Sequence, residues 1–195
     1  MFKSYIQTFL ITGVLYILML LSLSTYSDLK HAVPNTSKNC ISDTYRGTLS
    51  QEERIIDYIK IQNKELSTIT VKKIAENVIK QHKEQKLPIG LMLGLIKVES
   101  SFKQHAKSVV GAVGFWQVMP NIHHDKVVAY MASGKIKTAD LYDVDTNSTI
   151  GGRILKDCLN KHKNVKMSLL CYNGSQDDVE QTYANKVLKS IPRGV

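Results

Sequence analysis

Hydrophobic residues recur at helical spacing over most of the chain after residue 50. Ser50 followed by Glu53 is a capping-box pattern, which predicts that a helix begins there. Residues 70–85 carry apolar positions three and four apart, the pattern of an amphipathic helix. Further helical patterns cover residues 121–132, 147–161, 165–173 and 177–190. Because no long stretch alternates with a period of two, the sequence predicts an all-α fold with short loops.

The most apolar of these segments runs from Pro88 to Ser100. Proline suits the first turn of a helix, and the residues after Pro88 are apolar on nearly every face. We therefore expect a central, buried helix with Glu99 near its C-terminal end. An irregular, glycine-containing stretch follows at residues 108–120.

The N-terminal region has a different character. Residues 6–23 contain no charge, and Lys3 supplies a weak positive flank, which is typical of a signal peptide or an uncleaved membrane anchor over residues 1–27. Residues 28–48 are polar and predict a linker, which leaves residues 49–195 as one domain. Both interpretations of residues 1–27 place the domain outside the cytoplasm, in the periplasm or cell envelope, with anchoring in the inner membrane as one alternative.

The chain is basic, with a formal net charge of +9. Such a charge favours anionic partners, among them nucleic acid, an anionic membrane and an anionic cell wall. The lysines are scattered through helix-like stretches, as on solvated helix faces, and neither an RNA-binding aromatic signature nor zinc-finger spacing is present. Together with the export segment, this argues against a nucleic-acid-binding protein.

The three cysteines are Cys40, Cys158 and Cys171, and their spacing matches no CxxC motif. In an exported domain Cys158 and Cys171 are one candidate disulfide pair, because they fall in adjacent predicted helices. The favoured interpretation is that they are small buried hydrophobic residues.

Other polar clusters indicate no metal or cofactor site. His123 and His124 are adjacent, so their side chains point in different directions on a helix and one metal would seldom take both. Asp140, Asp143 and Asp145 are expected to be turn and cap residues. The alternative for one of them is the second carboxylate of a hydrolase.

Glu99 is the strongest candidate for chemistry. Burial raises the pKa of a carboxyl group, and the negative end of a helix dipole acts in the same direction. An acid that stays protonated near neutral pH is suited to protonating a glycosidic oxygen. The alternative is a glutamate at a helix end that reaches solvent.

Several motifs around Glu99 follow one another in a recognisable order. They are Glu99-Ser100, then Gly-Ala-Val-Gly-Phe-Trp-Gln-Val-Met-Pro at 111–120, Asn147 with Gly151, Cys-Tyr-Asn-Gly at 171–174, and Tyr-Ala-Asn-Lys-Val-Leu at 183–188. Over residues 70–190 this series resembles the lytic-transglycosylase domain of the goose-type lysozyme superfamily, which is glycoside hydrolase family 23-like. The resemblance implies a compact, lysozyme-like helical domain. The chain departs from the family pattern at Gly174-Ser175, which reverses the expected order of a small residue and glycine.

The resemblance also implies a reaction. Glu99 would protonate the oxygen between N-acetylmuramic acid (MurNAc) and N-acetylglucosamine (GlcNAc) in peptidoglycan. It would then act as base toward the C6 hydroxyl of the muramic acid, giving a 1,6-anhydro product without water. No motif supplies the second carboxylate of two-carboxylate glycosidases, and the acetamido group of the substrate would assist in its place.

The resemblance implies supporting roles as well. Ser100 would support Glu99 or the sugar by hydrogen bonding, and Gln117 and Met119 would line the glycan groove. Tyr172 would hydrogen-bond near Glu99 and hold it, and Asn173 would contact sugar or stabilise its loop. Trp116 is expected in the core rather than on a sugar.

Two alternatives to the lytic transglycosylase remain at this stage. One is a muramidase that hydrolyses the same bond. The other is a noncatalytic peptidoglycan-binding assembly component. By resemblance, small members of the family often open the wall locally for secretion, conjugation or pilus machinery or for phage entry.

Overall fold

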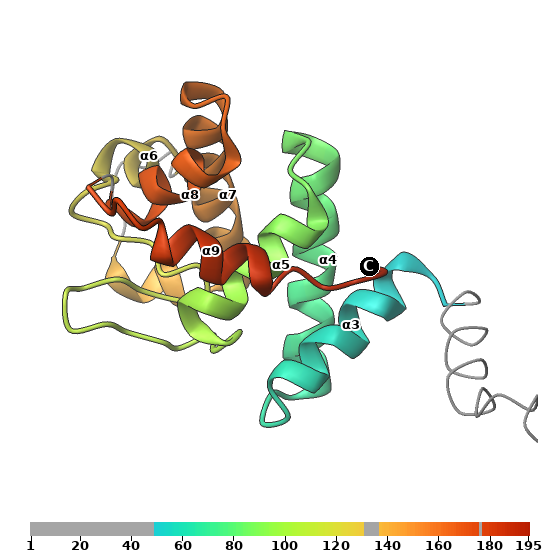
Figure 1. Cartoon of the computed structure of the whole chain (residues 1–195). Coiled ribbons are helices and arrows are strands. Elements are labelled where there is room, and N and C mark those ends of the chain that lie inside the picture. Colours follow the sequence, from blue (N-terminus) through green and yellow to red (C-terminus); the bar gives the residue numbers. More distant parts are fainter. Residues whose placement is uncertain (1–48, 131–136, 176) are drawn as a thin grey trace, which may run out of the picture. The chain divides into compact units, whose positions relative to one another are not determined.

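The computed structural model describes residues 49–130, 137–175 and 177–195 (Figure 1). Every described residue lies in one compact unit, Leu49–Val195. The predicted signal peptide or anchor and the predicted linker therefore lie outside the described residues. Within the described ranges, no helix combines the length and the apolar character needed to cross a membrane.

The predicted all-α class is confirmed for the described part of the chain, where the only β-type pairings are isolated bridges from Val113 to Lys107 and to Val118. The elements are α3 (Gln51–Gln62), α4 (Thr68–Gln85), α5 (Ile89–Ser100), α6 (His124–Tyr130), the 3-10 helix η1 (Thr138–Tyr142), α7 (Val144–Lys161), α8 (Val165–Asn173) and α9 (Thr182–Lys189).

The first described helix begins where the capping pattern predicts. The Ser50 hydroxyl accepts from the backbone N–H of Glu53 at 3.2 Å, and the Glu53 carboxylate accepts from the backbone N–H of Ser50 at 2.7 Å. These reciprocal bonds satisfy two backbone donors that the first turn of a helix leaves without partners.

Helix α5 is the central, buried helix that its composition predicts. Its residues from Leu91 to Ile96 are all buried, and α4 and α9 pack against it (Figure 1). Pro88 is the N-cap residue rather than a member of the first turn. The helix ends at Ser100, since Ser101 and Phe102 have left-handed backbone conformations with φ of 52° and 64°.

Three predicted helix starts were wrong by a few residues. Helix α7 begins at Val144 rather than 147, because the Asp143 side chain caps it by accepting from Thr146 N at 2.9 Å. Helix α6 begins at His124 rather than 121, after turns that follow Pro120. Helix α9 begins at Thr182 rather than 177, because residues 177–181 form turns and Gln181 has φ of 53°, which a right-handed helix cannot include.

A disulfide bond joins Cys158 on α7 to Cys171 on α8, with Cα atoms 5.8 Å apart. The expectation of two unbonded, buried cysteines was wrong, and the alternative pairing is the one observed. Helices packed against each other bring the two side chains together. A cross-link across this separation of 13 residues stabilises a fold by roughly 3 kcal/mol in the chain-entropy description.

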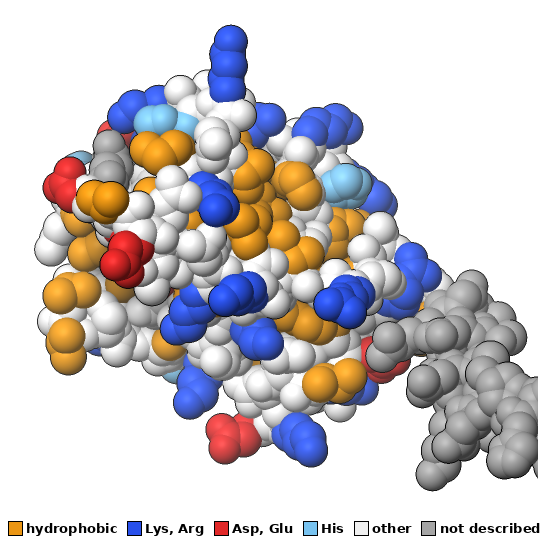
Figure 2. Space-filling model, viewed as in Figure 1, with side chains coloured by type: hydrophobic (Ala, Val, Ile, Leu, Met, Phe, Trp, Pro, Cys, Tyr) orange, Lys and Arg blue, Asp and Glu red, His pale blue; other side chains and the backbone are white. Residues whose placement is uncertain are grey.

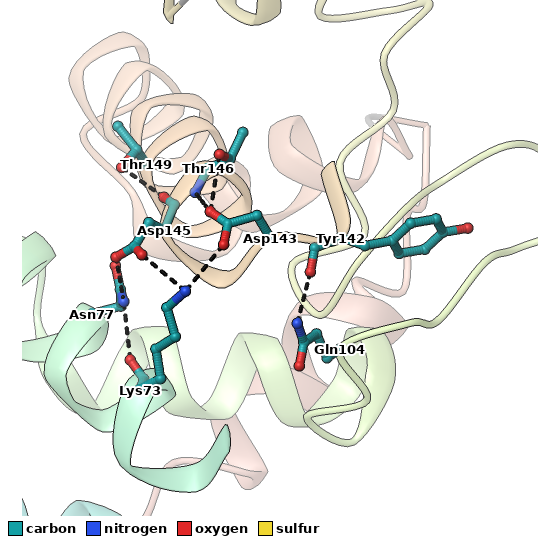
Figure 3. A network of polar contacts seen from close by, with 8 residues as sticks. All are labelled: Lys73, Asn77, Gln104, Tyr142, Asp143, Asp145, Thr146 and Thr149. Atoms are coloured by element: carbon teal, nitrogen blue, oxygen red, sulfur yellow. Dashed lines mark hydrogen bonds and ion pairs between the residues drawn. The ribbon is translucent and has the colours of Figure 1, made fainter. Parts of the chain in front are cut away.

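A polar network joins α4 to the start of α7 (Figure 3). Lys73 Nζ lies 3.0 Å from Asp143 Oδ2 and 3.1 Å from Asp145 Oδ2. Asn77 Nδ2 donates to Asp145 Oδ1 at 2.9 Å. Asp140 accepts from Lys137 N at 2.8 Å in η1. The three aspartates thus serve as turn, cap and ion-pair residues, as the first interpretation of their sequence positions expects.

Candidate active site

Glu99 lines a cavity of about 240 Å³ that lies between α5, α7, α8 and the irregular segment after α5. Five of the six site residues expected from the sequence line it: Glu99, Gln117, Met119, Tyr172 and Asn173. The other lining residues are Ser108, Val110, Ala112, Val118, His123 and Ile154. The structure therefore brings together residues that are up to 74 positions apart in the sequence, from Glu99 to Asn173.

The carboxyl group of Glu99 is tuned by opposing effects. Burial at the end of α5 is the largest effect and raises the pKa of Glu99, whose net value is about 7. A hydrogen bond from Tyr183 and the positive charge of Lys186 act in the opposite direction. Near neutral pH the group is thus present in both its acid and its carboxylate forms, which allows it to give up a proton and take one back.

Tyr183 is the side chain that holds Glu99. Its hydroxyl donates a hydrogen bond to Glu99 Oε1 from helix α9. Burial and the nearby Glu99 charge raise the pKa of Tyr183 far above its usual value, so the hydroxyl stays protonated and remains a donor. Sequence reasoning gave Tyr183 no site role, although the closing motif at 183–188 that begins with it was the available signal.

The bond to Glu99 was expected from Tyr172, and the structure gives Tyr172 a different partner. The Tyr172 hydroxyl donates to the backbone oxygen of Trp116 at 2.7 Å. The centres of the two rings lie 6.5 Å apart. Tyr172 therefore fixes the segment that carries Gln117 and Met119, and it contributes its ring to the cavity wall.

Ser100 also acts on this segment. Its hydroxyl donates to the backbone oxygen of Phe115 at 2.8 Å, and Ser100 is absent from the cavity lining. The expected support of Glu99 or of the sugar is therefore indirect: Ser100 ties the end of α5 to the irregular segment. Gln117 Nε2 donates to the Gly114 oxygen at 2.8 Å within that segment, which orients the Gln117 side chain at the cavity.

Asn147, on the first turn of α7, fixes the backbone of the irregular segment after α5 by hydrogen bonds. Its fully buried side chain donates to the oxygens of Val113 and Leu141 at 3.0 and 2.8 Å, and it accepts from Trp116 N at 2.9 Å. Gly114 approaches it closely with φ of 77°, and a Cβ there would lie 2.3 Å from Asn147 Nδ2. The glycine is therefore required by both space and backbone conformation.

Gly151 lies one turn further along α7 and makes room for the Trp116 ring. A Cβ at position 151 would lie 2.6 Å from Cγ of Trp116. Trp116 is fully buried, which confirms its expected place in the core. The spacing of Asn147 and Gly151 thus has a physical meaning: one residue holds the backbone of Trp116 and the other accommodates its ring.

His123 is a second titratable group on the cavity wall, and the sequence gave it no role there. Burial first, and then the charge of Lys126, lower the pKa of His123, so its imidazole is neutral near pH 7. Among the described residues no group of three or more His, Cys, Asp and Glu side chains is arranged to hold a metal ion.

The arrangement defines an all-α domain with a partly buried acid, Glu99, at the end of its central helix. The family model of the transglycosylase SLT domain matches residues 76–191, more than half of the chain, and the protein belongs to that family.

One curated relative is the transglycosylase of Enterobacteria phage PRD1. It is 27% identical over 106 residues, which make up 52% of this chain and 36% of the phage protein. The chain therefore matches about a third of the length of that relative.

Two solved structures are similar in outline. The lytic transglycosylase Slt of Pseudomonas aeruginosa has 20% identity and a TM-score of 0.47 over 60% of this chain and 20% of its own. The 70 kDa soluble lytic transglycosylase Slt70 of Escherichia coli has 18% identity and a TM-score of 0.49 over 80% of this chain and 29% of its own.

Proposed function

We propose that this protein is a peptidoglycan lytic transglycosylase that cleaves the β-1,4 bond between MurNAc and GlcNAc and leaves a 1,6-anhydro-MurNAc end. Glu99 is the acid and then the base of the reaction. Gln117, Met119 and Asn173 bind the glycan in the cavity.

The reaction needs one carboxyl group that first donates a proton and then accepts one. Glu99 gives its proton to the glycosidic oxygen as the bond from that oxygen to C1 of MurNAc breaks. The C6 hydroxyl of the same MurNAc then bonds to C1, and its proton passes to the Glu99 carboxylate. The acid is regenerated, and no water is consumed.

The observation that carries this proposal is the state of Glu99. It is a largely buried acid with a pKa of about 7, in a cavity and hydrogen-bonded by a tyrosine. Asp143 and Asp145 are engaged with Lys73 on the α4–α7 contact, and Asp140 with the backbone of η1, so these carboxylates have structural partners away from the cavity lining. This favours intramolecular attack by the C6 hydroxyl over activation of a water molecule by a second carboxylate.

We also propose that the domain works outside the cytoplasm, in the periplasm or cell envelope, after export directed by residues 1–27. The disulfide between Cys158 and Cys171 supports this location, because such bonds persist mainly in oxidising compartments. Local opening of the wall for a secretion, conjugation or pilus machine, or for phage entry, is the role we propose for this activity.

The surface charge suits an anionic polymer. The chain has 26 Lys and Arg residues against 17 Asp and Glu. Figure 2 shows many Lys and Arg side chains and few acidic ones on one face of the domain. Attraction of this kind lengthens residence on an anionic wall and weakens as salt is added.

Digestion of purified peptidoglycan by the full chain tests the proposal, with mass analysis of the released muropeptides. Glu99→Gln keeps the shape of the side chain and removes the acid, and Glu84→Gln, at an exposed site on α4, is the matched control. We expect anhydro ends from the wild type and from Glu84→Gln, and none from Glu99→Gln. Reducing ends would instead establish hydrolysis, and a folded wild type that binds the wall without cleaving it would indicate a noncatalytic component.

A further inference from the structure

The disulfide bond and the cavity share the same two helices. On α8, Cys171 directly precedes Tyr172 and Asn173, which both line the cavity. On α7, Cys158 lies one turn after Ile154, which also lines it. The cross-link therefore joins two walls of the cavity within one helical turn of the residues that form them.

Helix α8 is short and depends on its neighbours for its position. It has nine residues, from Val165 to Asn173, and it ends at Gly174, whose φ of 79° is left-handed. Residues 177–181 form turns before α9, and only residues 162–164 connect α8 to α7. A helix of this length is marginal alone, so packing and the cross-link at Cys171 decide where its C-terminal end lies.

The position of α8 reaches the rest of the site through two contacts. The Tyr172 hydroxyl bonds to the backbone oxygen of Trp116, next to Gln117 of the cavity wall. Helix α9, which carries Tyr183 and its bond to Glu99, packs against α8. A shift of α8 would therefore disturb both the cavity wall and the residue that orients the acid.

We propose that the disulfide between Cys158 and Cys171 is a positioning element of the active site, so that the enzyme reaches its full rate only when this bond is formed. The inference rests on the proposed function. Oxidation removes two protons and two electrons from the two thiols, and a thiol–disulfide oxidoreductase or a small disulfide accepts them. A dithiol reverses the step. Cys158 is buried but Cys171 is partly exposed, so a reductant can reach the bond from the Cys171 side.

The test uses the full chain in a Cys40→Ser background, so that Cys158 and Cys171 are the only cysteines. We compare its oxidised form, its form reduced with dithiothreitol, and the Cys158→Ser/Cys171→Ser variant, all well below their melting temperatures. A displacement on the order of 1 Å in a site costs up to about 100-fold in rate, and we expect kcat to fall about 10-fold on reduction with a smaller change in KM. Reoxidation should restore kcat, and dithiothreitol should not affect the doubly substituted variant.

A purely structural cross-link gives a different result. Reduction would then lower the melting temperature and leave kcat unchanged at low temperature, which would overturn the proposal.

A second measurement does not depend on catalysis. Trp116 is the single tryptophan of the chain, and it contacts Tyr172 of α8. Its fluorescence emission wavelength therefore reports on whether α8 stays packed against the cavity wall. We expect reduction to move the emission of Trp116 to longer wavelength while the far-ultraviolet circular dichroism of the helices is retained. An unchanged emission wavelength would refute the positioning role. If the oxidised chain does not cleave peptidoglycan, the proposed function fails, and the emission of Trp116 decides the positioning role by itself.

Discussion

The hydroxyl of Tyr183 donates a hydrogen bond to Glu99 Oε1, although the two residues are 84 positions apart in the sequence. The bond stabilises the carboxylate form of Glu99, whereas burial stabilises the acid form. The same tyrosine therefore orients the acid and prevents its pKa from rising further. This balance leads to the first of four predictions.

Replacing Tyr183 with phenylalanine should raise the pKa of Glu99 above its value of about 7, because a hydrogen bond that favours the carboxylate is lost. A hydrogen bond to a charged group contributes about 1.5–3 kcal/mol, which corresponds to a shift of about one to two pH units. The basic limb of the profile of kcat/KM against pH should move to higher pH by about that amount. The maximum of kcat/KM should be lower, because the bond that orients Glu99 is lost. Tyr142→Phe is the control, since the Tyr142 ring lies tilted against His105 and Tyr142 is not part of the cavity lining. An unmoved limb in Tyr183→Phe would contradict this role.

The rate of glycan cleavage should decrease as the pH rises through about 7, because the proposed reaction begins with the protonated form of Glu99, whose pKa is about 7. Well above this pH, each further unit should lower kcat/KM about tenfold. Initial rates on soluble glycan fragments from about pH 5 to about pH 9 measure the effect. A rate that continues to rise above neutral pH would show that Glu99 does not act as the acid.

Glu99→Gln should stabilise the fold at neutral and alkaline pH. The pKa of Glu99 is about 7 in the folded chain against 4.5 for the free group, so between these values the folded state binds a proton that the unfolded state has lost. The stability of the wild type should therefore fall as pH rises through this window, by roughly 3 kcal/mol, and the difference between glutamine and wild type should grow in parallel. Urea unfolding at about pH 4 and pH 8 gives the two free energies; a difference that does not change with pH would contradict the burial of the charge.

Gly151→Ala should destabilise the domain and disturb the site, because a Cβ at 151 would lie 2.6 Å from the Trp116 ring. Overpacking of this kind costs about 1–3 kcal/mol, and the emission of Trp116 should change with it. Gly152→Ala is the matched comparison on the same helix, since its Cβ would meet the terminal amide of Gln81, 2.8 Å from Oε1, rather than a ring. Thermal unfolding of both variants checks the difference, and equal losses would show that the tryptophan ring has room to move.

Much of the fold could be predicted because its signals are local. The capping box at Ser50 depends on residues three apart, and the apolar segment 89–96 is long enough to demand burial wherever it packs. The starts of α6 and α9 were predicted too early, because the turn residues before them, such as those at 177–181, are compatible with a helix in composition. The left-handed backbone conformation at Gln181 follows from packing at a distance. The start of α7 was predicted too late, because Asp143 caps that helix at Val144.

The cavity was predicted in part. Glu99 and four of its neighbours were identified from motif order, and the structure places them around one space. The hydrogen-bond partners of Tyr172 and Tyr183 were not predicted correctly. Both tyrosines follow α7 in the sequence, and nothing local to either one indicates which hydroxyl reaches Glu99. In the structure, the Tyr172 hydroxyl donates to the backbone oxygen of Trp116, and the Tyr183 hydroxyl donates to Glu99.

The sequence by itself determined the all-α class, the central apolar helix and the position of Glu99 near its C-terminal end, because helix caps, apolar periodicity and motif order are properties of neighbouring residues. Only the tertiary structure decided which tyrosine bonds to Glu99, that Cys158 and Cys171 are joined, and that Asn147 and Gly151 together hold Trp116. These contacts join residues 13 to 84 positions apart, and their existence depends on how the helices pack rather than on any local pattern.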